Sequence, residues 1–218
     1  MAQVFGRSIN WAARASILAV VVLVGGALSV LLNINRLDYV SFVGVARDQP
    51  VPFSHKHHVT GMGIDCRYCH TTVEEAPFAG IPPVETCMTC HSLVWTEAPL
   101  LEPVRAAFRD NKPLQWTRVH DLPDFVYFKH DIHINKGIGC VSCHGQVDQM
   151  PLMWKENTLN MEWCLECHRN PEKHIRPREH VFDMNWTPSG DQEKLGAQLV
   201  EDYGVQVQQL TDCSVCHL

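Results

Sequence analysis

The chain has 218 residues, with 24 acidic and 18 basic side chains and a formal net charge of −6 at pH 7. This length allows one domain or two small ones. An acidic balance without a run of basic residues argues against a nucleic-acid-binding protein, so we expect no nucleic acid partner.

The first element in chain order is the apolar run ILAVVVLVGGALSVLL, residues 17–32. With its flanks it is long enough to span a membrane as a helix. Arg7 and Arg14 precede the run and no acidic residue does. The positive-inside rule therefore predicts a cytoplasmic N-terminus and export of the residues that follow.

A cleaved signal peptide is the competing interpretation of this run, and it requires a small-x-small cleavage site after the apolar core. The residues from Asn33 to Asp38 contain no such site. We therefore predict an uncleaved single-pass anchor in residues 1–37, followed by a second domain over residues 38–218.

All ten cysteines occur in Cys-x-x-Cys pairs, and a histidine follows each pair directly. Thiols at this spacing lie about one helical turn apart, within reach of the two vinyl groups of one porphyrin, and the histidine then lies under the iron. The pattern predicts five covalently bound haem c groups. The attachment residues are Cys66, Cys69, Cys87, Cys90, Cys140, Cys143, Cys164, Cys167, Cys213 and Cys216, and the proximal iron ligands are His70, His91, His144, His168 and His217.

Other uses of paired cysteines explain the pattern less well. A zinc site joins two pairs into one tetrahedron, but five is an odd number and zinc requires no histidine after every pair. A redox disulfide usually occurs once, near a strand–helix pattern. A disulfide framework suits an exported chain, but it leaves the five histidines unexplained.

The haem domain contains an internal repeat. One module, about residues 53–95, opens with Phe-x-His-x-x-His at Phe53, and a second, about residues 128–172, opens with the same pattern at Phe128. Each pattern precedes a glycine-containing loop and two attachment sites. A C-terminal segment, residues 173–218, carries the fifth site.

Regular secondary structure is predicted only in short helices. Pro103 suits the first turn of a helix over residues 102–110, and a capping box at 189–192 precedes a helix over 192–203. Prolines break the rest into loops. We expect a mainly α-helical and irregular fold with little strand, in which a transmembrane helix precedes a compact domain whose core the haems supply.

The repeated pattern also predicts ligands on the distal side of four irons. Its two histidines stand at i and i+3 on one helical face, from which each can reach a different haem. The predicted distal ligands are His55, His58, His130 and His133, whereas His57 points elsewhere on its helix.

The distal ligand of the fifth haem stays open at this point. His120 is the first choice. A methionine thioether would raise the potential of that haem. The alternatives are Met150, Met153, Met161, His174 and His180.

The motifs resemble those of class III multihaem cytochromes and, more closely, the pentahaem subunit of alternative complex III. The similar elements are the N-terminal anchor and the stretches PVPFSHKHHVTGMGIDCRYCHTTVE, VHDLPDFVYFKHDIHINKGIGCVSCHG and LNMEWCLECHRNPE. The resemblance implies a quinol:electron acceptor oxidoreductase of a bacterial cytoplasmic membrane, with the haem domain on the periplasmic side. It implies as partners an iron–sulfur protein, polytopic quinol-binding subunits and a monohaem cytochrome c.

These observations favour an electron-transfer subunit without a catalytic site, relaying electrons through five haems to a periplasmic acceptor. A single apolar helix cannot enclose a quinol, so we expect no quinol site in this chain. A stand-alone membrane-anchored quinol dehydrogenase that feeds soluble reductases is the alternative. A haem enzyme of the nitrite- or hydroxylamine-converting class needs an open iron, and enough histidines are present to close all five.

A pyridine haemochrome assay against protein mass should give five haems per matured chain. Replacing Cys140 with Ala should weaken one attachment and destabilise the second module, because a missing haem leaves a large void. Four or fewer haems in fully matured wild-type protein would contradict the count.

Overall fold

The computed structural model describes residues 6–34 and 36–217. Contacts between residues divide the chain into two compact units, residues 1–42 and residues 43–218. The limits predicted for the anchor, the haem domain and its modules stay predictions.

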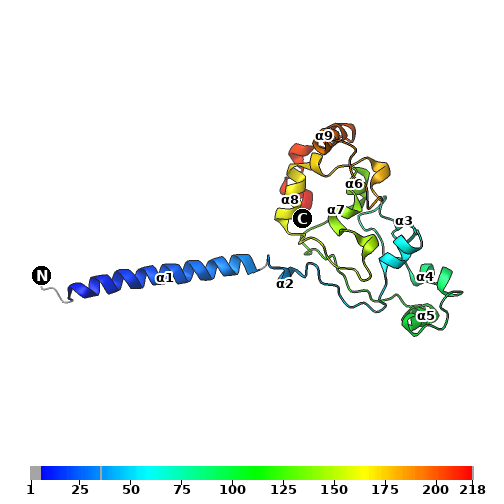
Figure 1. Cartoon of the computed structure of the whole chain (residues 1–218), viewed down its shortest axis with the longest axis horizontal. Coiled ribbons are helices and arrows are strands. Elements are labelled where there is room, and N and C mark those ends of the chain that lie inside the picture. The colour runs from blue at the N-terminus through cyan, green and yellow to red at the C-terminus, as the bar shows by residue number, and fades with distance from the viewer. Residues whose placement is uncertain (1–5, 35, 218) are drawn as a thin grey trace. The chain divides into compact units, whose positions relative to one another are not determined.

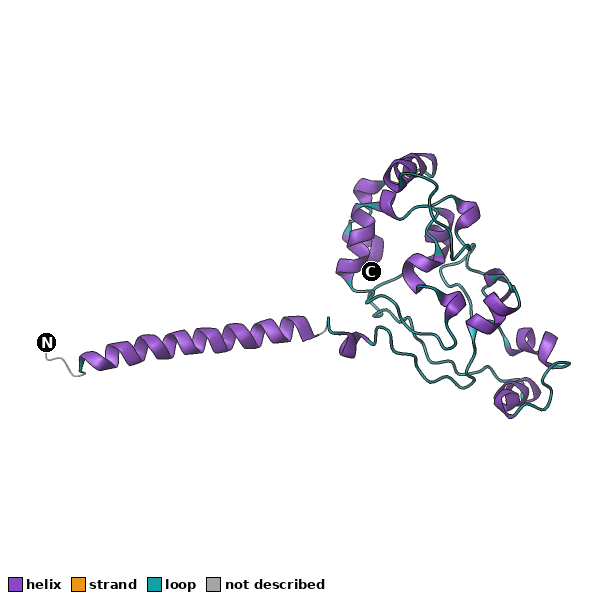
Figure 2. Cartoon of the chain, viewed as in Figure 1, coloured by secondary structure: helices purple, strands orange, loops and turns teal. Residues whose placement is uncertain are grey.

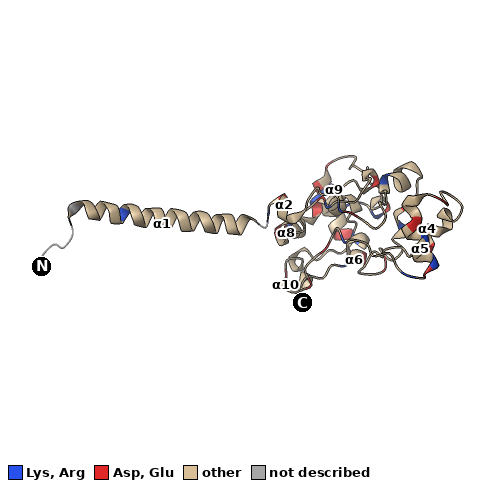
Figure 3. Cartoon of the chain, turned by 90° about the horizontal axis from the view of Figure 1, so that it is seen from below, with Lys and Arg blue, Asp and Glu red and all other residues tan. Residues whose placement is uncertain are grey.

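The first unit consists of α1, Arg7–Ile34, and α2, Asp38–Ser41. Among the described residues, α1 is the one helix long and apolar enough to cross a membrane, and Figure 3 shows almost no charge along it. Its polar side chains bond within the helix: Ser16 Oγ donates to the carbonyl of Ala13 at 2.9 Å, and Asn33 Nδ2 to that of Ser29 at 2.7 Å. This satisfies polar groups that hydrocarbon cannot solvate.

The second unit is built from short helices joined by long loops, as Figures 1 and 2 show. Within the described residues it contains no strand, only isolated β-bridges. The predicted class, mainly helical and irregular, is confirmed. The helices are the π-helical η1, Lys56–Gly61, then α3, Cys66–Cys69; α4, Val84–His91; η2, Pro99–Leu101; α5, Glu102–Arg109; α6, His130–Asn135; α7, Cys140–His144; η3, Val147–Gln149; α8, Met161–Arg169; η4, Pro171–Lys173; η5, Arg178–His180; α9, Gln192–Asp202; η6, Val207–Gln209; and α10, Cys213–Cys216.

Each Cys-x-x-Cys pair lies within a helical turn. The pairs begin α3, α7 and α10 and lie inside α4 and α8. At α3 the side chain of Asp65 accepts a hydrogen bond from the backbone N–H of Arg67, which caps the turn. The backbone N–H of His70 then donates to the carbonyl of Cys66 at 2.9 Å. Helical geometry therefore places the two thiols of a pair about one turn apart, as attachment requires.

Three loop segments far apart in sequence lie side by side below α7 in Figure 1. The N–H of Gly44 donates to the carbonyl of Lys155 at 2.8 Å, and the amide of Gln49 exchanges two 2.9 Å hydrogen bonds with the backbone of Thr117. Thr117 Oγ1 also donates to the carbonyl of Asp48 at 2.9 Å. These bonds fix the loop that leads to His120.

The polypeptide supplies little core of its own. Among the described residues, only eleven hydrophobic side chains are buried, and two small clusters contain three buried residues each. One cluster joins Val51 to Leu101 and Val104 of α5; the other joins Val73, Ile134 of α6 and Val181. A chain of this size normally builds a larger apolar interior.

The two predicted longer helices are present. Residues 102–110 were expected and α5 ends at Arg109; residues 192–203 were expected and α9 ends at Asp202. The predicted cap of the second was wrong, because Asp191, not Ser189, accepts hydrogen bonds from the N–H groups of Glu193 and Lys194. Asp191 directly precedes the first helical residue, which is the position where a side-chain cap acts.

Helix α9 packs closely against η4 through Gly196. A Cβ at Gly196 would lie 1.8 Å from the carbonyl oxygen of Glu172, so only glycine fits. Gly196→Ala should lower the free energy of unfolding by about 1–3 kcal/mol, because the overlap outweighs the better helix propensity of alanine.

Thermal denaturation of the haem-loaded chain in detergent measures this change. Gly190→Ala is the matched control, since a Cβ there meets nothing within 4 Å. Equal midpoints for the two variants would show that the contact does not hold α9.

Candidate haem-binding sites

The sequence repeat is also a repeat in three dimensions. The ring of Phe53 stacks on His58 at 4.3 Å and meets His55 edge-on at 5.0 Å. The ring of Phe128 stacks on His133 at 4.4 Å and meets His130 edge-on at 4.8 Å. Each phenylalanine therefore holds its two histidines in the same mutual arrangement.

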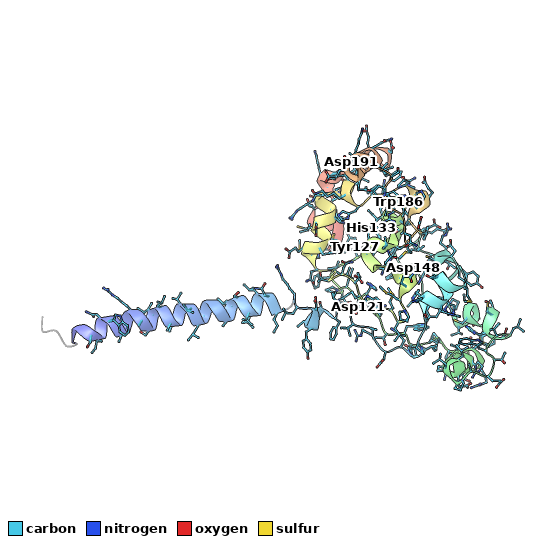
Figure 4. All side chains as sticks on the ribbon, in the orientation of Figure 1. Asp121, Tyr127, His133, Asp148, Trp186 and Asp191 are labelled. Carbon is cyan, nitrogen blue, oxygen red and sulfur yellow. The ribbon has the colours of Figure 1, made fainter. Side chains whose placement is uncertain are left out.

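Three of these four histidines face a histidine that follows a cysteine pair. The ring centroids of His130 and His144 lie 6.3 Å apart with planes only 6° from parallel. The other two pairs are His58 with His91 at 6.3 Å and His133 with His168 at 6.1 Å. His133, labelled in Figure 4, projects from α6.

The fourth pairing is visible in the electrostatics. The pKa of His55 is lowered to about 4, mainly by burial and then by the charges of His70 and His58. After burial, the charge of His70, the predicted proximal ligand of the same module, has the largest effect on the pKa of His55. Its Nδ1 is buried without a hydrogen-bond partner within the described residues.

Most of the predicted ligands orient their rings through Nδ1. Seven hold Nδ1 against a backbone carbonyl at 2.7–3.3 Å, which leaves Nε2 available. These are His58, His70, His91, His130, His133, His168 and His217. Such a bond fixes the tautomer and the ring plane of a metal-binding histidine.

Burial keeps several of these rings uncharged. It lowers the pKa of His144 to about 3, with His120 and His130 contributing, and it lowers the pKa of His133. Neutral imidazole is the form that binds a metal, so these sites are prepared for one at neutral pH.

Comparison with known proteins decides which metal group this arrangement serves. Residues 126–218 match the family described as cytochrome c7 and related cytochrome c. Over 172 residues the chain is 30% identical to the multihaem cytochrome c subunit of menaquinone reductase from Nitratidesulfovibrio vulgaris, covering 78% of this chain and 68% of that protein. The chain belongs to the multihaem cytochromes c.

The paired rings of this multihaem cytochrome fit haem iron. Imidazole nitrogen binds metals at about 2 Å, and the ring centre lies roughly an ångström behind that nitrogen, so two imidazoles on one iron have centres about 6 Å apart. The three measured separations, 6.1–6.3 Å, match this requirement. All ten thiols are unpaired and so remain free to form thioethers.

Charge effects between cysteines link the five cysteine pairs in one order. Burial and then Cys69 raise the pKa of Cys87, and burial and then Cys66 raise that of Cys140 to about 11. In each case burial shifts the pKa most, and the charge of a cysteine from another pair comes second. The same holds for the remaining pairs. Burial and then Cys167 raise the pKa of Cys143 to about 12, and burial and then Cys216 raise that of Cys164.

These charge effects connect the sites in the order α4, α3, α7, α8 and α10. The two ends of the order, α4 and α10, lie at opposite sides of the second unit (Figures 1 and 3). The sequence alone did not predict this order, because the spacing along the chain says nothing about which sites meet.

Residues 125–127 contact the last cysteine pair and the histidine that follows it. His217 Nδ1 lies 3.3 Å from the carbonyl of Phe125, whose ring stacks on His217 at 5.9 Å. Val126 forms a bridge with His217, and the Tyr127 hydroxyl donates to the carbonyl of Ser214. Sequence reasoning missed this role for residues 125–127, which carry no motif.

His120, the first choice for the fifth distal ligand, contacts a different site. Its ring centroid is 4.3 Å from that of His144, and its Nε2 lies 3.3 Å from His144 Nδ1. Burial, and next the charge of Lys155, lower the pKa of His120 to about 4. Whether His120 binds an iron stays a prediction.

The other candidates for the distal ligand of the fifth haem lie in different environments. Met150 is fully buried, whereas Met161 is 59% exposed. Burial lowers the pKa of His174, whereas His180 Nδ1 lies 3.8 Å from a carboxylate oxygen of Asp183 and its ring stacks on Trp186. Met153 is only partly buried.

His130→Ala should open one iron of the oxidised holoprotein. With the ring opposite His144 removed, one haem in five should become high-spin in electron paramagnetic resonance and bind carbon monoxide when reduced. His57→Ala is the matched control, since His57 is exposed and packs against Trp95. An unchanged low-spin spectrum in His130→Ala would refute the pairing.

Proposed function

We propose that this chain is the pentahaem electron-transfer subunit of a membrane complex that oxidises quinol and passes electrons to a periplasmic acceptor. The observation that carries the proposal is the continuous order of five attachment sites from α4 to α10. Charge effects between successive cysteine pairs support the proposal that the bound haems would form one line.

The ligand assignment belongs to this proposal. Haem c supplies reversible one-electron chemistry when bound. Four proximal histidines are each proposed to share an iron with the histidine opposite, which closes both axial positions and excludes a substrate. The proposed pairs are His70 with His55, His91 with His58, His144 with His130, and His168 with His133.

We propose that residues 1–37 anchor the chain and that residues 38–218 form the haem domain on the periplasmic side of a bacterial membrane. The length and apolar character of α1 support the anchor. The two arginines before the apolar run support a cytoplasmic N-terminus. Haem attachment outside the cytoplasm agrees with this orientation.

A complex of the alternative complex III type is the finer assignment. It rests on the motifs of the chain and on a relative that is itself a subunit, of menaquinone reductase. The proposed partners are an iron–sulfur protein, polytopic quinol-binding subunits and a monohaem cytochrome c. Within α1 the run 17–32 contains no ionisable side chain to take a proton from quinol, so the quinol site is assigned to a partner.

The name of the relative favours a second candidate, in which the same line works in the opposite direction. In a menaquinone-reducing complex, the haem domain would receive electrons from a periplasmic donor and deliver them toward the membrane. The ligand pairs serve both directions, since closed irons transfer electrons either way.

Stopped-flow reduction of the holoprotein by a quinol analogue tests the proposal. The isolated subunit should be reduced slowly and without effect of quinol-site inhibitors, whereas the assembled complex should be reduced rapidly and inhibitably. Rapid, inhibitable reduction of the isolated chain would instead identify a stand-alone quinol dehydrogenase. If quinol does not reduce the complex but a reduced periplasmic cytochrome does, the second candidate is correct.

A further inference from the structure

Among the five predicted proximal ligands, His144 is oriented differently from the other four. Seven predicted ligands hold Nδ1 against a backbone carbonyl, but His144 Nδ1 faces a side chain, Nε2 of His120, at 3.3 Å. The ring centroids lie 4.3 Å apart and the rings cross at 73°, so the two rings meet edge-on and do not stack. The contact joins one nitrogen of each imidazole.

The direction of this hydrogen bond follows from the proposed role of His144. If Nε2 of His144 binds iron, the proton of its neutral ring is on Nδ1, and Nδ1 must be the donor. Nε2 of His120 is then the acceptor. Both rings are half-buried, and burial is the first cause that lowers the pKa of each.

We propose that His120 is a positioning residue that accepts this hydrogen bond, fixes the plane of His144 and lowers the reduction potential of the haem at α7. This inference rests on the proposed ligation by His144. An imidazole nitrogen is a stronger base than a carbonyl oxygen, so it draws the Nδ1 proton further. The greater negative charge on the iron-bound ring favours oxidised iron, since hydrogen bonding to axial ligands sets haem potentials.

The surroundings hold His120 for this role. Its loop is fastened at Thr117 to Gln49 and Asp48 by three hydrogen bonds of 2.9 Å. The α7 site is also the middle member of the five-site order, so its reduction equilibrium affects transfer through both halves of the line. The sequence favoured His120 as the distal ligand of the fifth haem, but in the structure His120 contacts His144 of the α7 site.

Redox titration of the full haem-loaded chain in detergent tests the proposal. His120→Phe keeps a ring of similar size but provides no acceptor, so one of the five haems should become roughly threefold to tenfold easier to reduce. His120→Gln places an amide oxygen within reach of Nδ1 and should recover most of the difference. His57→Phe, which makes the same substitution beside a different ligand, should leave all five potentials unchanged.

Electron paramagnetic resonance of the same samples separates the possible failures. All irons that are low-spin in the wild type should remain so in His120→Phe, and a new high-spin signal would show that His120 is itself a ligand and overturn the proposal. Five unchanged potentials, or equal shifts in His120→Phe and His120→Gln, would also overturn it while leaving the electron-transfer proposal intact. Failure of that underlying proposal would differ, because the wild type would already contain several high-spin irons.

If His120→Phe does not mature with a full complement of haem, His120→Leu replaces it with a smaller apolar side chain. The same rise in one reduction potential is expected. A new high-spin signal or five unchanged potentials would count against the hydrogen bond.

Discussion

The requirement that a predicted iron-binding histidine hold its Nδ1 proton in place accounts for much of the second unit, where seven such rings hold Nδ1 against a backbone carbonyl. Where Nδ1 meets a carbonyl, the ring can neither rotate nor change tautomer, and Nε2 is left for the metal. The carbonyls come from distant parts of the chain: Pro77 serves His130, and Leu210 serves His168. Loops that lack regular secondary structure are thus held in place by the rings they orient.

The same requirement explains how a chain with so few buried apolar residues keeps a defined structure. Met150, Ile175 and Val181 are the largest side chains that are fully buried among the described residues. A fold of this kind depends on its cofactors for the free energy that a conventional core would supply.

Sequence was most informative where chemistry fixes spacing. The cysteine pairs predicted a helical turn at each site, and the i, i+3 histidines predicted two rings on one face, as the contacts of Phe53 and Phe128 show. The helices at 102–109 and 192–202 followed from proline placement and apolar periodicity. Asp191 was missed because Ser189 presents an equally good capping pattern two residues earlier.

The sequence did not predict which residues far apart along the chain are in contact. Nothing local indicates that His120 meets His144 across 24 positions, or that Phe125 meets His217 across 92. Both contacts are made by loops whose course depends on tertiary hydrogen bonds and not on local propensity. The order of the attachment sites has the same origin, and it is the feature from which the proposed electron line derives.

The central claim is that particular histidines from the two modules share particular irons in one continuous order. A cryo-electron microscopy map of the haem-loaded complex, at a resolution that shows axial ligands, tests it most directly. The account predicts irons between His55 and His70, His58 and His91, His130 and His144, and His133 and His168, arranged from α4 to α10 without a branch. Irons between rings of different pairs, or an interrupted order, would contradict it.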